Sequence, residues 1–323
     1  MQKPIDAVKP KQYLLTKLVA AVSVVLALTA CGSDNNPTSA TPAKTGVASL
    51  PPGNLLVDPT NTKNLSASEL THLFNATEPY FSQVATTPKC GVRVEYMQYD
   101  TVDVKGKKTD ATGAVFIPTG TDASCQGNRP VVLNAHGTAT SKSYNFAEVG
   151  NNQNEAGPRA TLLAALFAGQ GYVVISPNYA GYDKSSLAYH PYLNAQQQSH
   201  EMADALKAGR EVVRRTSTAT KVADNGKLFI TGYSQGGYVT MAATRYLESL
   251  KEPVTAALPI SGPYAMGAFG DVVFGGKVML GATFFAPMMA RNYQEQYGNI
   301  YSKPSDIYAP ANADEIASLL PNA

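Results

Sequence analysis

A serine between two glycines constrains the fold of this chain more than any other feature. The segment Gly232-Tyr233-Ser234-Gln235-Gly236 follows an apolar run at 227–231 that is typical of a β-strand, and a helical pattern covers 235–250. Glycine on both sides permits a turn so tight that a Cβ atom would strike neighbouring backbone, and such a turn leaves the serine strained and exposed. The pattern favours a turn that presents Ser234 as a nucleophile, and a plain glycine-rich turn without a chemical role is the alternative.

Two backbone segments are candidates for an oxyanion hole beside Ser234. The helix after the serine would aim its N-terminal amides at it, so the N–H of Gln235 could stabilise an oxyanion formed there. A second donor has to come from a loop after an earlier strand. The sequence His136-Gly137-Thr138 follows the apolar run at 131–134, and it makes Gly137 and Thr138 candidates for that donor.

Short strands and helices alternate along most of the chain. Residues 92–99 and 111–117 alternate around the turn Lys105-Gly106-Lys107, which predicts an antiparallel hairpin. Beyond it, strands separated by helices of about 10 to 20 residues predict right-handed βαβ units, a largely parallel sheet and an α/β fold. The predicted strands are 131–134, 172–176, 227–231 and 254–260, and the predicted helices are 66–74, 159–168, 195–215 and 235–250. From Gly262 onward the pattern is weakly helical and offers no further strand.

The order of these features resembles the α/β-hydrolase superfamily, and within it the secreted lipases and esterases. The shared features are the first strands, the His-Gly loop and the Gly-Tyr-Ser-Gln-Gly turn, and the likeness runs from about Cys90 to Gly262. The resemblance implies an α/β-hydrolase core at 54–264, followed by a cap or lid segment at 265–323. It also implies a serine hydrolase that needs no cofactor.

The same resemblance assigns neighbours to the site. In the family, the histidine of the His-Gly loop lies beside the oxyanion hole, so His136 is placed there and not in a catalytic triad. The segment 176–182, which contains Tyr179, resembles the loop that borders the substrate pocket, and Tyr233 is expected beside Ser234.

The triad itself is incomplete in this sequence. The family order is serine, acid, histidine, whereas the four histidines, at positions 72, 136, 190 and 200, all precede Ser234. The missing strands with the acid and the histidine would require roughly two more βα units of about 30 residues each. We therefore expect the chain to be truncated at its C-terminus, with its last strands missing, and to be nearly inactive in this form.

Other interpretations of the site stay open. The chain could be complete and catalytically dead, serving as an envelope binding lipoprotein, or His190 in a loop near the pocket could replace the missing histidine. Asp271 follows the strand that ends near Ile260, at a position where some family members carry their acid, although nothing else in the sequence orients it.

The amino terminus predicts export. Lysines up to Lys17 precede an apolar run at 18–28 that is too short to span a bilayer, which is typical of a signal peptide over residues 1–30. The segment Leu28-Thr29-Ala30-Cys31 resembles the lipobox of bacterial lipoproteins. This resemblance implies lipidation of Cys31 and, because Gly32 follows, an outer-membrane or cell-surface location, with secretion behind an ordinary signal peptide as the alternative.

Residues 31–53 are rich in small and polar residues and are expected to form a flexible tether. Once Cys31 is set aside, Cys90 and Cys125 are the remaining cysteines, and an oxidising periplasm would let them form a disulfide. Two buried free thiols are the alternative.

Charge and motif searches exclude several classes of function. The net charge of +2 comes from residues 1–30, which carry +3, so the rest offers no basis for nucleic-acid binding. A zinc-protease helix is not supported because Asp204 stands where a second histidine would follow His200-Glu201, and Gly276-Lys277 lacks the leading glycine of a P-loop.

The expected function is hydrolysis of carboxylic esters through an acyl-enzyme on Ser234. The apolar segment 272–289 would cover the pocket and favours small-molecule acyl or aryl esters, or lipids. A peptidase on the same fold is the alternative enzyme, because the turn at Ser234 does not distinguish esters from amides.

Overall fold

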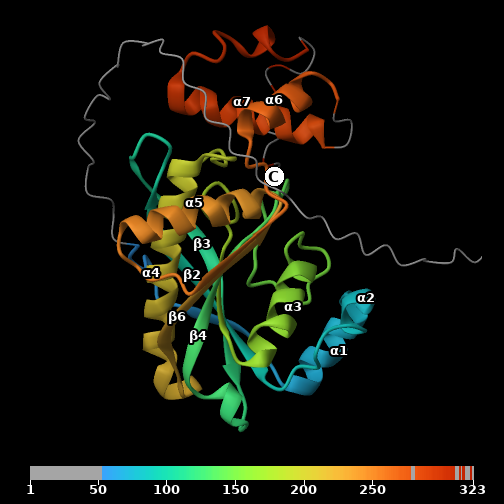
Figure 1. The fold of residues 1–323 in the computed structure, drawn as a ribbon, viewed down its shortest axis with the longest axis vertical. Coiled ribbons are helices and arrows are strands. Elements are labelled where there is room, and N and C mark those ends of the chain that lie inside the picture. The colour runs from blue at the N-terminus through green and yellow to red at the C-terminus, as the bar shows by residue number, and fades with distance from the viewer. Residues whose placement is uncertain (1–52, 278–280, 310–312, 314, 317–320, 322–323) are drawn as a thin grey trace, which may run out of the picture. The chain divides into compact units, whose positions relative to one another are not determined.

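The computed structural model describes residues 53–277, 281–309, 313, 315, 316 and 321. They belong to a compact unit that spans residues 47–323 and is built on a seven-stranded sheet (Figure 1). The signal peptide, Cys31 and nearly all of the tether lie outside the described residues.

The sheet is mixed and has the strand order β1-β2-β3-β5-β4-β6-β7. The pairs β1–β2, β2–β3 and β3–β5 are antiparallel, and β4 to β7 run parallel to one another, as in the α/β-hydrolase fold. The strands are β1 (Thr60–Leu65), β2 (Gly91–Val102), β3 (Lys108–Thr119), β4 (Gly127–Ala135), β5 (Val173–Pro177), β6 (Val222–Tyr233) and β7 (Ala256–Ile260). The predicted α/β fold and the predicted hairpin, which is β2 with β3, are confirmed.

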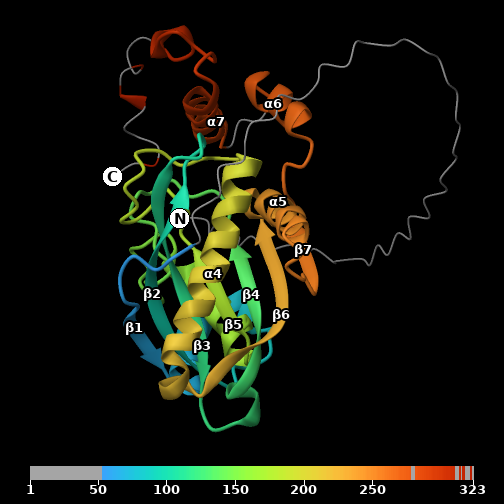
Figure 2. The same cartoon turned by 90° about the vertical axis from the view of Figure 1, so that its left-hand side faces the viewer.

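Helices cover both faces of this sheet (Figures 1 and 2). The helices are α1 (Ala67–Thr77), α2 (Pro79–Ser82), α3 (Gly157–Leu166), α4 (Ala195–Thr220), α5 (Gln235–Ser249), α6 (Met266–Phe274) and α7 (Ala282–Tyr297), with 3₁₀ turns at Ala123–Cys125, Ala168–Gln170 and Pro304–Asp306. Helices α4 and α5 pack against each other on one face, and α1 and α3 pack against each other on the other. Within the described residues, no helix is both long enough and apolar enough to cross a membrane.

The central strands are apolar on both faces because helices cover both faces. All five residues of β5 are buried, as are residues 131–135 of β4. Strand β7 differs, because it forms the edge of the sheet and its residues alternate between exposed and half-buried; Leu258 is 62% exposed.

Two features of the fold were not anticipated from the sequence. Strand β1 has the polar sequence TNTKNL, and it is held by backbone pairing with β2 rather than by an apolar face, so it carries no hydrophobic alternation. Strand β6 begins at Val222, five residues before the predicted start, because residues 222–224 pair with the beginning of β4.

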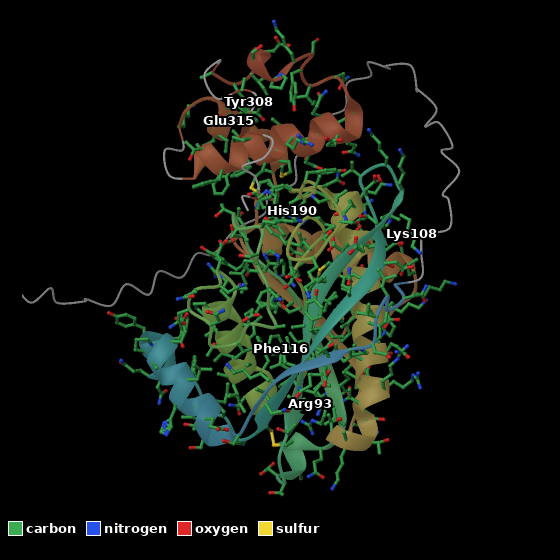
Figure 3. All side chains as sticks on the ribbon, turned by 180° about the vertical axis from the view of Figure 1, so that it is seen from behind. Arg93, Lys108, Phe116, His190, Tyr308 and Glu315 are labelled. Carbon is green, nitrogen blue, oxygen red and sulfur yellow. A yellow bond between two sulfur atoms is a disulfide. The ribbon has the colours of Figure 1, made fainter. Side chains whose placement is uncertain are left out.

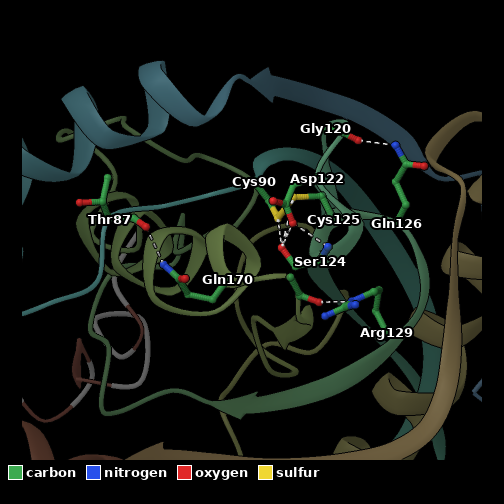
Figure 4. Close-up of a disulfide and its surroundings, with 10 residues drawn as sticks. Thr87, Cys90, Gly120, Asp122, Ser124, Cys125, Gln126, Arg129 and Gln170 are labelled. Carbon is green, nitrogen blue, oxygen red and sulfur yellow. Dashed lines mark hydrogen bonds between the residues drawn. A yellow bond between two sulfur atoms is a disulfide. The ribbon is translucent and has the colours of Figure 1, made fainter.

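The predicted disulfide between Cys90 and Cys125 is confirmed, with an S–S distance of 2.01 Å (Figure 4). It connects the segment just before β2 with the 3₁₀ turn before β4, and both cysteines are fully buried. Beside it, Arg129 Nε donates to the carbonyl oxygen of Gly171 at 2.7 Å. The bond closes the end of the sheet opposite to Ser234.

Residues 262–277 and 281–309, which we call the C-terminal segment, contain α6 and α7 and lie beyond the carboxyl ends of the parallel strands (Figure 1). Its buried residues form a second apolar cluster around Met288 and Met289, which includes Tyr192 and Leu193 from the loop before α4. The weakly helical pattern predicted after Gly262 is therefore confirmed.

Candidate active site

Ser234 lies at the tight turn between β6 and α5, with φ 59° and ψ −122°. This left-handed conformation is strained for a serine and is a common feature of functional positions. A Cβ atom on Gly236 would lie 2.0 Å from the carbonyl oxygen of Ala135, and one on Gly232 would lie 2.4 Å from the carbonyl oxygen of Gly236. Both positions therefore require glycine, as the sequence predicted.

The loop after β4 lies directly beside this turn. A Cβ atom on Gly137 would be 3.7 Å from the Cβ atom of Ser234 and 3.2 Å from the carbonyl oxygen of Tyr233. The structure thus brings together the two segments, Gly137-Thr138 and Gln235, that the sequence nominated as donors to an oxyanion.

The carbonyl oxygens of this loop are engaged by buried side chains. Tyr179 Oη donates to the carbonyl oxygen of His136 at 3.2 Å, and His136 Nδ1 lies 2.6 Å from the carbonyl oxygen of Gly137. Because a trans peptide points its N–H opposite to its C=O, the N–H groups of Gly137 and Thr138 point away from these partners. Such an arrangement leaves the two amides available for another acceptor.

Further tyrosines brace the same loop. Tyr182 Oη donates to the carbonyl oxygen of Ala139 at 2.6 Å, and the hydroxyls of Tyr192 and Thr138 are hydrogen-bonded at 2.9 Å. Burial raises the pKa of Tyr192 to about 12, so its hydroxyl keeps its proton at neutral pH. The loop is held by side chains of the segment between β5 and α4.

His136 is buried between the rings of Tyr144 and Tyr179. Its centroid lies 4.5 Å from that of Tyr144 and 4.0 Å from that of Tyr179, in stacked geometry, and Nε2 lies 3.0 Å from the carbonyl oxygen of Asn178. Burial lowers the pKa of His136 to about 4, so the ring is neutral at pH 7 and donates to only one of the carbonyl oxygens of Gly137 and Asn178. It lies next to the loop, where the family resemblance places it.

His190, labelled in Figure 3, is equally buried, and its ring stacks on Tyr179 with a centroid distance of 5.4 Å. Its Nδ1 is 3.0 Å from the carbonyl oxygen of Ala180, and its Nε2 is 2.6 Å from Nε2 of Gln235. Burial lowers its pKa to about 3. Both ring nitrogens are engaged, so the geometry does not support the alternative in which His190 replaces the missing histidine.

The other two histidines are remote from Ser234. His72 is exposed on α1, and His200 on α4 stacks against Tyr246 with a centroid distance of 4.4 Å. Within the described residues, none of the four histidines forms a hydrogen bond with Ser234. Asp271 lies exposed in α6, and no hydrogen bond in the described part of the chain connects it to a histidine.

The two tyrosines that the sequence placed near the site have different environments. Tyr233, next to the serine, is 57% exposed. Tyr179 is fully buried with φ 68°, so it lies under the loop and supports it instead of forming the surface of a pocket.

Sequence reasoning missed the partners of Gln235 and the role of Glu201. Glu201 is fully buried on α4, and its Oε1 accepts a hydrogen bond from the backbone N–H of Ala180 at 2.7 Å. Burial raises its pKa to about 7. The density of aromatic residues at 179–192 was the available signal, but nothing local showed which groups they would contact.

Comparisons with known proteins agree with this geometry. Residues 159–281 match the prolyl oligopeptidase family of peptidases. The rice cell wall degrading esterase LipA from Xanthomonas oryzae is similar in structure, with a TM-score of 0.69 and 30% identity over 84% of this chain and 67% of that chain. A putative hydrolase from Legionella pneumophila is also similar in structure, with a TM-score of 0.68 and 25% identity over 82% of this chain and 67% of that chain. No curated protein sequence matches significantly.

Proposed function

The chain belongs to the α/β-hydrolase superfamily, in the same family as the LipA esterase, and from this premise we propose that it hydrolyses carboxylic esters through an acyl-enzyme on Ser234. One observation carries the proposal. A strained serine at a strand-to-helix turn lies beside the loop after β4, and buried side chains hydrogen-bond to the carbonyl oxygens of that loop. This leaves backbone N–H groups of the loop available to an oxyanion, as acyl transfer requires.

In the proposed mechanism, Ser234 Oγ attacks the ester carbonyl carbon, and the carbonyl oxygen becomes an oxyanion. The N–H of Gln235 and those of Gly137 and Thr138 stabilise this charge. The tetrahedral intermediate then expels the alkoxide, which takes up the proton released by the serine and departs as the alcohol, and an acyl group remains on Ser234. In a second step water hydrolyses this ester, releases the carboxylic acid and restores the serine hydroxyl. No cofactor takes part.

The serine proton needs an acceptor, and the described residues bring no imidazole to Ser234. We therefore propose that the 323-residue chain acylates slowly, because a general base contributes typically about 100-fold to 10,000-fold to such a step. Stabilisation of the oxyanion remains, and it supports measurable reactivity of the serine in the absence of a base.

The C-terminal segment supports a preference for apolar substrates. A cavity of about 760 Å³ lies within it and is lined almost entirely by apolar side chains, among them Phe274, Met289 and Ile307. Cavities of this size commonly hold small organic ligands. We propose that residues 54–264 form the core and residues 265–323 a cap, and that the cap selects acyl or aryl esters over charged ones.

A peptidase is the second candidate, and the match of residues 159–281 to the prolyl oligopeptidase family favours it. The esterase is preferred because the likeness to LipA extends over 84% of the chain. Steady-state kinetics on p-nitrophenyl esters and on aminoacyl p-nitroanilides separate the two: we expect turnover of the esters only.

Ester turnover should disappear in Ser234→Ala and persist in Ser249→Ala, which removes an exposed hydroxyl at the end of α5. Equal turnover by Ser234→Ala and the unmodified chain, at a rate above that of the uncatalysed reaction, would refute the proposed nucleophile. Turnover of anilides at rates above those of the esters would replace the esterase with the peptidase.

We also propose that Cys31 is lipidated and anchors the protein to the cell envelope. The disulfide between Cys90 and Cys125 supports an oxidising compartment. Fractionation tests the anchor: the unmodified protein should partition with membranes and Cys31→Ser should be soluble, whereas identical distribution of both would refute lipidation.

A further inference from the structure

We propose that His190 is a positioning residue, which holds the side chain of Gln235 and thereby fixes one backbone donor of the oxyanion hole. The inference rests on the proposed function, because it concerns the amide that faces the oxyanion. It assigns to His190 a role that differs from that of a proton acceptor for Ser234.

The directions of the hydrogen bonds around His190 follow from its partners. The carbonyl oxygen of Ala180 can only accept, so the hydrogen of the neutral ring must be on Nδ1, 3.0 Å away. Nε2 is then an acceptor, and the Nε2 amide group of Gln235, 2.6 Å away, donates to it. One backbone carbonyl thus determines both the tautomer of His190 and the orientation of the Gln235 amide.

The other end of this connection is anchored in the core. The N–H of Ala180 donates to Oε1 of Glu201 at 2.7 Å, and Oε2 of the same carboxyl accepts from Gln197 at 3.0 Å. Both of these side chains belong to α4 and are buried. Hydrogen bonds therefore run from α4, through residue Ala180 and His190, to the first residue of α5.

Stacked rings join the same histidine to the other half of the oxyanion hole. Tyr144, His136, Tyr179 and His190 form a column with successive centroid distances of 4.5, 4.0 and 5.4 Å. His136 contacts the carbonyl oxygen of Gly137 at one part of this column. The column connects the loop after β4 with the start of α5, so both donor segments share one rigid support.

Gln235 itself shows that this support is specific. Gln235 is 1% exposed, and its Oε1 is buried with no hydrogen-bond partner among the described residues. A buried amide oxygen without a hydrogen bond is unfavourable, and a leucine or methionine at this position would avoid that cost. An amide at this buried position has a purpose if its hydrogen bond to His190 holds Gln235 in place, and with it the backbone N–H next to Ser234.

Two measurements test this assignment, and the first needs no catalytic activity. Nitrogen-15 NMR of the imidazole side chains reports which ring nitrogen carries hydrogen. In the unmodified protein, we expect His190 to show hydrogen on Nδ1 with Nε2 as an acceptor, unchanged between pH 5 and pH 8. Hydrogen on Nε2, or protonation of the ring with a midpoint near pH 6.5, would overturn the proposal.

The second measurement is the rate at which a fluorophosphonate labels Ser234. We expect His190→Leu and Gln235→Met each to label about 10-fold to 100-fold more slowly, the range associated with a misplaced or lost oxyanion donor. His190→Gln can still accept from Gln235 and should recover part of the rate. The matched control His72→Leu, on exposed α1, should label at the unmodified rate.

The double variant distinguishes positioning from general damage to the fold. If His190 acts through Gln235, the combined substitutions should slow labelling no more than either one alone. Unchanged labelling in folded His190→Leu would refute the positioning role. Absence of any Ser234 adduct in the unmodified protein would instead refute the proposed function, while the NMR result would still decide the state of His190.

Discussion

Ser234 separates two regions that are built in opposite ways. On one side, residues 136–194 are largely buried and are connected by hydrogen bonds and stacked rings, including the column from Tyr144 to His190. On the other side lie β7 and the C-terminal segment, with exposed apolar residues such as Leu258 and Phe274. The first region holds the proposed amide donors Gly137 and Thr138 in a dense network, whereas the second leaves apolar side chains exposed.

This difference separates two requirements of acyl transfer. Stabilisation of an oxyanion depends on groups that do not move during the reaction, and the proposed donors Gly137 and Thr138 belong to the braced region of residues 136–194. Selection of a substrate depends on a surface that can admit and release it, and under the proposed function the apolar cavity of the C-terminal segment serves that purpose. Four substitutions or conditions should expose the contrast.

The largest effect is expected from one added methyl group at the turn. In Gly236→Ala, the new Cβ would lie 2.0 Å from the carbonyl oxygen of Ala135, so the turn must shift. We expect the free energy of unfolding to fall by about 3 kcal/mol, and labelling of Ser234 by a fluorophosphonate to slow at least about 100-fold. Urea denaturation and labelling kinetics measure the two effects.

The matched control for this variant is Gly270→Ala in α6, where a Cβ would meet no atom within 4 Å. It should stabilise the helix by about 0.5 to 1 kcal/mol. Similar losses at both glycines would contradict the contrast between the two regions.

The disulfide belongs to the braced side of the molecule. Cys90→Ser with Cys125→Ser opens a connection across 35 residues, and we expect a loss of about 3 kcal/mol in the free energy of unfolding. Because the bond lies at the end of the sheet opposite to Ser234, labelling of the serine in the folded variant should not change. Slower labelling at a temperature where the variant is folded would show that the disulfide also shapes the site.

The buried acids of α4 predict how stability depends on pH. Burial raises the pKa of Glu201 to about 7 and that of Asp204 to about 8, whereas both lose their protons near pH 4 in the unfolded chain. The folded state therefore holds more protons between these values, and stability falls as pH rises. From pH 6.5 to pH 8.5 we expect a decrease on the order of 2 kcal/mol.

This window lies above the range in which the buried histidines have the opposite effect. Burial lowers the pKa values of His136 and His190, so below about pH 6.5 the unfolded chain binds protons that the folded chain does not. The free energy of unfolding therefore decreases as the pH falls below about 6.5. Asp204→Asn should reduce the slope measured by denaturation between pH 6.5 and pH 8.5. A slope equal to that of the unmodified protein would show that Asp204 does not titrate in this range.

The smallest effect is expected where the C-terminal segment meets the braced region. Asn292 on α7 is fully buried, and its Nδ2 donates to the carbonyl oxygen of Tyr192 at 3.0 Å. Asn292→Ala should weaken this contact by about 1 kcal/mol and increase limited proteolysis within residues 298–309, with little change in the main unfolding transition. Asn128→Ala, at an exposed position of β4, is the control and should not change cleavage.

The sequence predicted those parts of the fold that depend on local pattern. The turn at Ser234, the hairpin and the parallel strands were found because glycine spacing and hydrophobic alternation act over a few residues. Strand β1 was missed because its polar residues carry no hydrophobic alternation; backbone pairing with β2 and side-chain hydrogen bonds, such as that of Lys63 to the carbonyl oxygen of Val149, hold it. The cysteine pair could be predicted because only two cysteines remained after Cys31 was set aside.

The support of the site could not be predicted in the same way. The contact between His190 and Gln235 joins residues 45 positions apart, and the stack of His136 on Tyr179 joins residues 43 positions apart. Such pairs depend on the order of β4 and β5 in the sheet and on the packing of α5 against it, and no periodicity in the sequence reveals either. The sequence therefore identified the groups that would react, while the structure was needed to identify the groups that hold them.

Mass spectrometry of the protein after reaction with a fluorophosphonate shows whether Ser234 is the nucleophile. We expect a single covalent adduct on Ser234, absent when the protein is unfolded before the reaction and absent in Ser234→Ala. A folded protein that carries no adduct on Ser234, or that carries it on another serine, would contradict the assignment of Ser234 as the nucleophile.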